Sequence, residues 1–209
     1  MLLSYNGDAN AHLIAIGSST GGVETLRDIF AQLPANCPPI VMTQHMPPSF
    51  TTSFAARLDS ISAVSVKEAE EGDKLKPGHA YLARGGRHLS IIKSGTDFIC
   101  HLEDGAAVSG HRPSVDVLFN SVAEVAALRA VGVILTGMGK DGAQGLLKMR
   151  QNGSRTIGQN KNSCVVYGMP KAAYSIGAVE EELALADIPA RILSLCEKER
   201  KVRHAAGAE

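Results

Sequence analysis

Short runs of apolar residues alternate along the chain with longer segments in which apolar residues recur at helical spacing. The runs predict buried strands over 12–17, 40–43 and 131–135, with weaker strand candidates over 156–159 and 164–166. The helical spacing predicts helices over 22–33, 49–58, 114–128, 143–151 and 187–198, the third capped by Ser114 and the last by Asp187. This alternation favours a parallel sheet with right-handed crossovers.

The middle of the chain has a different pattern. Three further strand candidates, 79–83, 87–93 and 96–103, follow one another with only Gly85-Gly86 and Ser94-Gly95 between them. These turns predict an antiparallel hairpin attached to the main sheet. The expected fold class is therefore α/β: a doubly wound, mainly parallel sheet with an attached hairpin, in a three-layer Rossmann-like architecture. We expect one domain over 12–198, with tails at 1–11 and 199–209.

Composition narrows the class of protein. Lys plus Arg and Asp plus Glu are both 21, and aromatic residues make up 4% without any Trp. A nucleic-acid-binding protein should carry a basic excess and stacking aromatics, so we expect no nucleic-acid partner. Neither a signal peptide nor a run of about 18 apolar residues is found, so we expect no membrane insertion and a cytoplasmic location. The four cysteines form no metal-site spacing, and we expect neither metal nor cofactor.

The first predicted strand runs into a glycine-rich turn, Gly17-Ser18-Ser19-Thr20-Gly21-Gly22, before a helix. Such a turn can bind a phosphate at the helix N-terminus, although Ser19 replaces the middle glycine of the dinucleotide pattern. The same residues also fit G-x-S-x-G around Ser19, a turn that presents a nucleophilic serine. By itself this motif leaves both interpretations open.

Two further polar residues follow predicted parallel strands. The second strand ends in Gln44-His45, and Asp141 lies in the Gly-rich loop after the VGVIL strand. The carboxyl ends of parallel strands meet at one edge of the sheet, so Ser19, His45 and Asp141 are expected to converge there. A serine, a histidine and an aspartate at one edge predict a catalytic triad.

The segment 111–116 offers rival residues. Asp116 could replace Asp141 as the acid, and Ser114 could supply a second hydroxyl. We favour a structural interpretation, in which Ser114 caps a helix and Asp116 lies in its first turn. Arg112 could line the cleft and meet an acidic substrate. The remaining histidines, His12, His79, His88, His101 and His204, have no convincing partner spacing.

Six motifs in order resemble the catalytic domain of the CheB family of chemotaxis methylesterases, known as protein-glutamate methylesterase and protein-glutamine glutaminase. They are LIAIGSSTGG, TQHMPP, KPGHAYLARGGRH, HRPSVDVLF, AVGVILTGMGKDG and SCVVYGMPKAA, and the resemblance covers about residues 12–195. It implies hydrolysis of methylated glutamates on the cytoplasmic helices of chemoreceptors by a serine carboxylic-ester hydrolase, with possible deamidation of glutamines. We further expect a monomer.

The resemblance also assigns roles to residues. The family nucleophile, the serine before Thr-Gly-Gly, corresponds to Ser19, the base to His45 and the acid to Asp141. The family's loop methionine, here Met138, supplies a backbone oxyanion donor, and Thr20 is a natural second one. Ser18 stands where the family commonly has alanine. The family usually carries an N-terminal receiver domain, for which the eleven residues before 12 leave no room, so we expect none here. A nucleotide-binding module and a non-catalytic receptor-binding domain are the alternatives.

Overall fold

The structure, a computed structural model, describes residues 2–206, with side chains to residue 197. Its centre is a seven-stranded sheet in which every neighbouring pair is parallel. Across the sheet the strands are β3 (Ser65–Glu68), β4 (His79–Leu82), β2 (Ile40–Gln44), β1 (Leu13–Ser18), β7 (Ala130–Ile134), β8 (Arg155–Gln159) and β9 (Glu181–Leu183). The central strands are buried along their whole length, as expected for a sheet covered on both faces.

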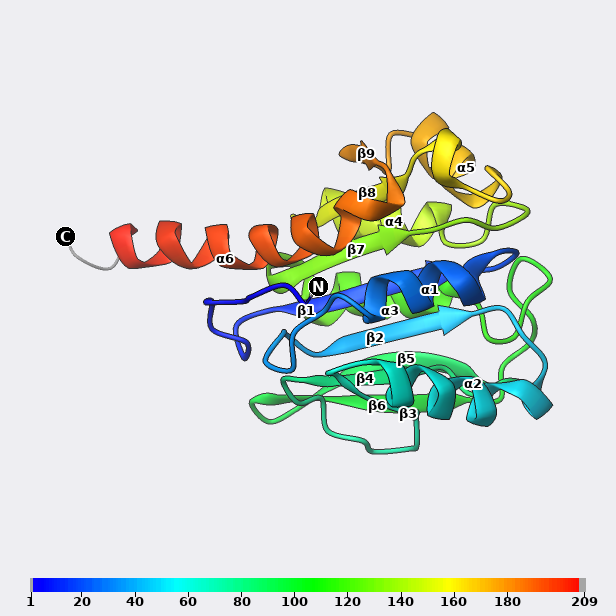
Figure 1. Ribbon diagram of the computed structural model, residues 1–209. Helices are drawn as coiled ribbons and strands as arrows, with labels where there is room; N and C mark the ends of the chain where they lie inside the picture. Colours follow the sequence, from blue (N-terminus) through cyan, green and yellow to red (C-terminus); the bar gives the residue numbers. More distant parts are fainter. Residues whose placement is uncertain (1, 207–209) are drawn as a thin grey trace.

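Helices cover both faces of this sheet (Figure 1). One face carries α1 (Gly22–Phe30), α2 (Pro48–Ile61) and α6 (Ile188–Ala206), whose apolar residues share one core cluster with the sheet. The other face carries α3 (Val115–Val125), α4 (Ala143–Gln151) and α5 (Met169–Ser175), which share a second core cluster. The expected three-layer α/β class is confirmed.

An antiparallel hairpin, β5 (His88–Ser94) with β6 (Asp97–Glu103), packs outside α3. Leu89 and Ile91 join the core on that side of the sheet, and the N–H of Ile91 donates to Ser121 Oγ of α3 at 2.9 Å. The predicted hairpin is therefore present, but it forms its own two-stranded sheet. Grouping 79–83 with it was wrong, because β4 joins the parallel sheet between β2 and β3.

Other differences lie in short or peripheral segments. β3, α5 and β9 were not predicted, and 164–166 forms no strand. The predicted helix 114–128 ends at Val125 and is followed by a 3-10 turn, Ala127–Arg129. α6 begins after the 3-10 turn Leu185–Asp187 and runs past the expected end at 198, because 199–206 holds good helix formers and neither Gly nor Pro. The rest of the expected tail, 207–209, lies outside the described residues.

The register of the central strands determines what meets at the carboxyl edge. Ser18 pairs with Gln44 between β1 and β2, and Gly17 pairs with Ile134 between β1 and β7. Ser19 and His45 therefore leave adjacent strands at the same level, and the N–H of His45 extends the pairing by donating to the Ser18 carbonyl at 3.1 Å. The loop that carries Asp141 leaves the strand on the other side of β1.

Candidate active site

Ser19 stands in a sharp turn between β1 and α1. Its N–H donates to the Thr136 carbonyl at 3.0 Å, and its carbonyl accepts from the Gly22 N–H at 2.8 Å. Gly21 precedes the helix with a φ of 83°, a left-handed conformation that favours glycine. A Cβ on Gly137 would lie 2.8 Å from Cβ of Ser19, so only glycine allows the next loop to approach this closely.

The amide of Gln44 links this turn to the His45 backbone. Its Nε2 donates to the carbonyls of Ser19 and His45, both at 3.0 Å, and its Oε1 accepts from Ser18 Oγ at 2.7 Å. Ser18 and Gln44 are buried. The Gln44 side chain therefore holds the two strand ends together, a role that sequence reasoning missed.

The Asp141 carboxylate is bound at the N-terminus of α3. Its Oδ1 accepts from Ser114 Oγ at 2.7 Å and from the Asp116 N–H at 3.1 Å, and its Oδ2 accepts from the Val115 N–H at 2.7 Å. Burial raises the pKa of Asp141, but the hydrogen bonds from His45, Ser114, Val115 and Asp116 outweigh it, and the net pKa is lowered. Asp141 is therefore an anion buried among fixed donors.

His45 meets this carboxylate directly. Its Nε2 lies 2.7 Å from Asp141 Oδ2, and the two side chains are 7% and 1% exposed. Because a carboxylate accepts, Nε2 carries the ring proton and Nδ1 is the free acceptor. Nδ1 is buried and has no hydrogen-bond partner among the described residues. The structure thus brings His45 and Asp141 together. It places Ser19 on the adjacent strand end, without a hydrogen bond from its hydroxyl to His45.

Asp116, the alternative acid, bonds to α4 and not to His45. Its Oδ1 accepts from the Gly145 N–H of α4 at 2.7 Å. Burial raises its pKa, and the neighbouring Asp141 charge adds to this increase, against the hydrogen bonds from Gly145 and Gly142. Ser114 is the expected cap of α3, accepting from the Val117 N–H at 3.4 Å. Asp141, not Asp116, is therefore the carboxylate in contact with His45.

A sequence model of the CheB methylesterase family matches residues 14–192. The chain belongs to the CheB methylesterase family. It is 60% identical over 188 residues to the protein-glutamate methylesterase/protein-glutamine glutaminase of Agrobacterium fabrum, covering 90% of this chain and 53% of that protein. The corresponding protein of Caulobacter vibrioides is 57% identical over 189 residues, with 90% and 55% covered. The chain therefore spans about half the length of the curated relatives it matches.

A solved structure matches almost completely. The Thermotoga maritima CheB methylesterase catalytic domain superposes with a TM-score of 0.87 at 41% sequence identity, over 89% of this chain and 99% of that one. The described part of our chain thus has the fold of a CheB catalytic domain.

The two backbone groups expected to bind an oxyanion lie in exposed turns of this CheB domain. The Thr20 carbonyl accepts from Thr136 Oγ1 at 3.0 Å, and the carbonyl of Gly137, next to Met138, accepts from the Met169 N–H at 2.8 Å. The N–H groups of Thr20 and Met138 themselves donate to no acceptor within the described residues. They are free to bind a ligand, and their loops are fixed.

Other candidate residues from the sequence lie around this site. Arg112 donates to the Gly105 carbonyl at 2.8 Å and is exposed. His88 does have partners: its Nδ1 accepts from the Ser114 N–H at 3.1 Å, and its Nε2 lies 2.9 Å from the Ala106 carbonyl. This buried histidine supports the Ser114 cap that holds Asp141. The sequence spacing did not indicate this contact, because His88 and Ser114 meet only in the folded chain.

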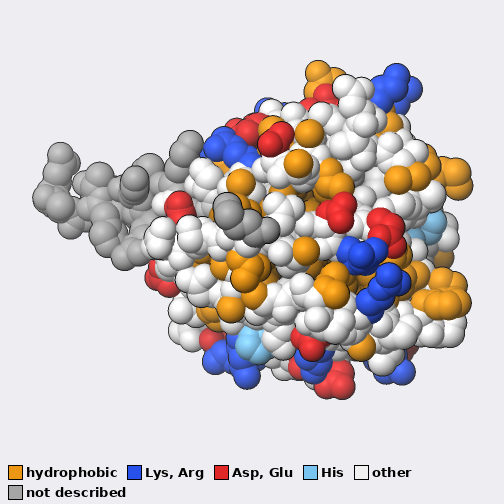
Figure 2. Space-filling view, viewed as in Figure 1, with side chains coloured by type: hydrophobic (Ala, Val, Ile, Leu, Met, Phe, Trp, Pro, Cys, Tyr) orange, Lys and Arg blue, Asp and Glu red, His pale blue; other side chains and the backbone are white. Residues whose placement is uncertain are grey.

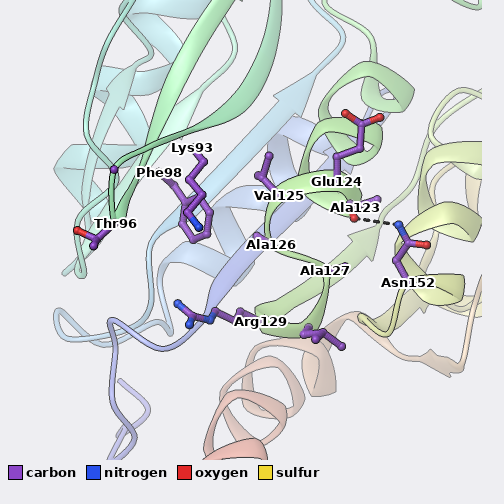
Figure 3. A pocket seen from close by; sticks show the side chains of 12 residues that line it. Lys93, Thr96, Phe98, Ala123, Glu124, Val125, Ala126, Ala127, Arg129 and Asn152 are labelled. Atoms are coloured by element: carbon purple, nitrogen blue, oxygen red, sulfur yellow. Dashed lines mark hydrogen bonds between the residues drawn. The ribbon is translucent and has the colours of Figure 1, made fainter.

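Three further observations concern regions of the described residues away from this site. A cavity of about 650 Å³ lies between the β5–β6 hairpin and the C-terminal end of α3, near Arg129 at the opposite edge of the sheet (Figure 3). It contains none of the candidate residues. Among the described residues, no group of three or more His, Cys, Asp or Glu is placed to hold a metal ion. No helix within the described range is both long and apolar enough for a membrane crossing.

Proposed function

We propose that this chain hydrolyses glutamate γ-methyl esters on the cytoplasmic helices of chemoreceptors, and that Ser19, His45 and Asp141 are its catalytic triad. The observation that carries the proposal is the buried 2.7 Å contact between His45 and Asp141 beside Ser19. The names of the relatives, protein-glutamate methylesterase and protein-glutamine glutaminase, supply the substrate class.

The first half-reaction transfers an acyl group to Ser19. His45 Nδ1 takes the hydroxyl proton as Ser19 Oγ attacks the ester carbonyl, and a tetrahedral oxyanion forms. Asp141 stabilises the imidazolium through Nε2. The Thr20 and Met138 N–H groups would bind the oxyanion, each contributing about 3 kcal/mol in well-studied hydrolases. The imidazolium then protonates the departing methoxide, so methanol leaves and an acyl-Ser19 ester remains.

The second half-reaction hydrolyses the acyl-enzyme and regenerates the free Ser19 hydroxyl. Water gives a proton to His45 Nδ1 and attacks the acyl-Ser19 carbonyl, after which Ser19 leaves with that proton and the glutamate side chain is released. A glutamine side chain would follow the same route and release ammonia. No step requires a metal ion or organic cofactor, and none is proposed.

The surroundings of the site suit a protein substrate. Three side chains at this edge, Phe50 in the first turn of α2 and Met138 and Val165 in loops, are 56%, 70% and 70% exposed. Figure 2 shows hydrophobic side chains at the right-hand margin, toward which the strand arrows of Figure 1 point. Exposed apolar groups around a polar centre are typical of a surface that binds another macromolecule. The nucleotide-binding alternative would require an acidic residue after β2 to bind a ribose, but His45 occupies that position.

The test is methanol release from methylated receptor by wild type, Ser19→Ala and Ser18→Ala. The rate of methanol release by Ser19→Ala should be lower than that of wild type by at least about 10⁴-fold, close to the residual rate of a triad without its nucleophile. Ser18→Ala should keep most of the rate, because its hydroxyl is bound to Gln44. A Ser19→Ala variant with near-normal methanol release would exclude the proposed nucleophile.

A further inference from the structure

The ring of His111 lies flat against the ring of His45. The two ring centroids are 3.7 Å apart and the planes differ by 11°. One face of the His45 ring, the candidate base, is therefore covered by a second imidazole. On the edge of the same His45 ring, Nε2 contacts Asp141. The two histidines come from distant parts of the chain.

The backbone around His111 is fixed by a tight turn. Val108 and His111 exchange N–H···O=C hydrogen bonds of 3.0 and 2.9 Å, and the residues between them, Ser109 and Gly110, both have positive φ, 52° and 81°. This is the backbone of a two-residue hairpin turn. Ser114, which binds Asp141, follows shortly after. One short segment thus positions both the ring over His45 and the cap that holds the acid.

The His111 side chain has no other specific partner in the described part of the chain. It forms no hydrogen bond or ion pair there, and the stack with His45 is its ring contact. Burial lowers the pKa of His111, the neighbouring His45 lowers it further, and the Asp141 carboxylate opposes both effects. His111 is therefore neutral at neutral pH, and it places no positive charge beside His45 when that ring accepts a proton.

A single hydrogen bond does not fix a ring. If the hydrogen bond from Nε2 to Asp141 were its only specific contact, the His45 imidazole could rotate about that bond. Nδ1 would then move away from Ser19. A parallel ring against its face removes this motion. We propose that His111 is a positioning residue, which holds the His45 ring so that Nδ1 remains available to the Ser19 hydroxyl. This inference rests on the proposed function, because it assigns His45 the role of base.

The kinetic test compares His111→Ala, which removes the ring, with His111→Phe, which keeps a flat ring without nitrogens. A matched control is His101→Ala, on β6, where the exposed side chain pairs with Glu71. With methylated receptor, His111→Ala should lower kcat about tenfold or more with KM nearly unchanged, since small misplacement of a catalytic group costs up to about 100-fold. His111→Phe should return to within about threefold of wild type, and His101→Ala should match wild type.

Two kinetic results would overturn the inference. Wild-type kcat in His111→Ala would show that the stack does not position the base. A His111→Phe variant as slow as His111→Ala would show that a ring nitrogen acts instead of the ring face. Thermal unfolding of each variant separates these results from loss of fold, and the Phe variant preserves the packing if Ala does not.

A spectroscopic measurement keeps this inference separate from the proposed function. The proton on His45 Nε2 is observed by NMR in each variant. Its signal should be protected from solvent exchange in wild type and His111→Phe, and broadened by exchange in His111→Ala. Equal protection in all three would contradict positioning by His111. If wild type releases no methanol, the proposed function fails, whereas the NMR comparison still decides the positioning claim.

Discussion

His45 Nε2 and Asp141 Oδ2 lie 2.7 Å apart in the interior, and this contact decides which nitrogen of the histidine can act. The carboxylate accepts from Nε2, so Nδ1 is left as the proton acceptor. The well-known triad of chymotrypsin uses the two nitrogens the other way round, with Nδ1 toward the aspartate. The roles of base and orienting acid are preserved in both arrangements, because each needs only one nitrogen.

Replacing Asp141 with Asn should therefore disable the base. The asparagine amide can donate to Nε2, which would transfer the ring proton to Nδ1, the nitrogen that must accept from Ser19. By analogy with other triads, kcat for methanol release should fall by about 10⁴-fold. The control is Asp116→Asn, which should retain kcat within about tenfold, because Asp116 bonds Gly145 and not His45. The reverse ranking of these two variants would make Asp116 the acid.

The same Asp116→Asn variant should be more stable than wild type at neutral pH. The folded-state pKa of Asp116 is raised by burial and by the Asp141 charge, so ionisation of Asp116 destabilises the folded state. This penalty begins above the unfolded pKa, about 3.9, and is complete above the folded pKa. We therefore expect Tm at pH 7 to rise, and in a domain of this size each kcal/mol of stabilisation corresponds to about 2–4 °C.

Calorimetry of both proteins across pH measures this effect. The difference in Tm should shrink as pH falls and disappear below about pH 3.9, where wild-type Asp116 is protonated in both states. A gain that persists unchanged at low pH would assign the stabilisation to something other than the Asp116 charge.

Replacing Gln44 with Glu should loosen the link between the two strand ends. The carboxylate cannot donate to the carbonyls of Ser19 and His45, which Gln44 Nε2 now satisfies at 3.0 Å each. Leaving a buried acceptor unpaired costs about 1–3 kcal/mol, so we expect a clear drop in stability together with a fall in kcat of about tenfold or more.

Ser18→Ala is the matched comparison for Gln44, because it removes only the hydroxyl that donates to Gln44 Oε1. It should lower the free energy of unfolding by about 1 kcal/mol and leave kcat nearly unchanged. Urea unfolding and methanol release measure the two quantities. Equal kinetic damage in Gln44→Glu and Ser18→Ala would argue that Gln44 does not hold the strand ends for catalysis.

The fold could be predicted where pattern and structure share a physical cause. The buried strands β1, β2 and β7 are short apolar runs, and their carboxyl ends must meet at one edge of a parallel sheet. That geometry, together with the G-x-S-x-G pattern, led from the sequence to Ser19, His45 and Asp141 as candidates, and the family resemblance assigned their roles. By contrast, β3 buries only Val66 fully and β9 is Glu181–Leu183, so neither edge strand carries an apolar run.

The supporting contacts of the site could not be predicted, because they depend on side-chain placement after folding. His111 reaches His45 only when the turn at 108–111 is brought over the end of β2. Gln44 is the last residue of β2, a strand that is buried along its whole length. Nothing in its sequence position indicates that its amide donates to two carbonyls. The family resemblance assigned roles to the triad residues but none to Gln44 or His111, although both lie within the quoted motifs TQHMPP and HRPSVDVLF.

The central claim is that Ser19 is the nucleophile and that His45 activates it. The most direct measurement is labelling of the intact protein with a fluorophosphonate, which forms a stable adduct with an activated serine, followed by peptide mass spectrometry. The account predicts one adduct on Ser19 in wild type, and none in Ser19→Ala or His45→Ala. An adduct on Ser18 or Ser114, or labelling of Ser19 that does not depend on His45, would contradict it.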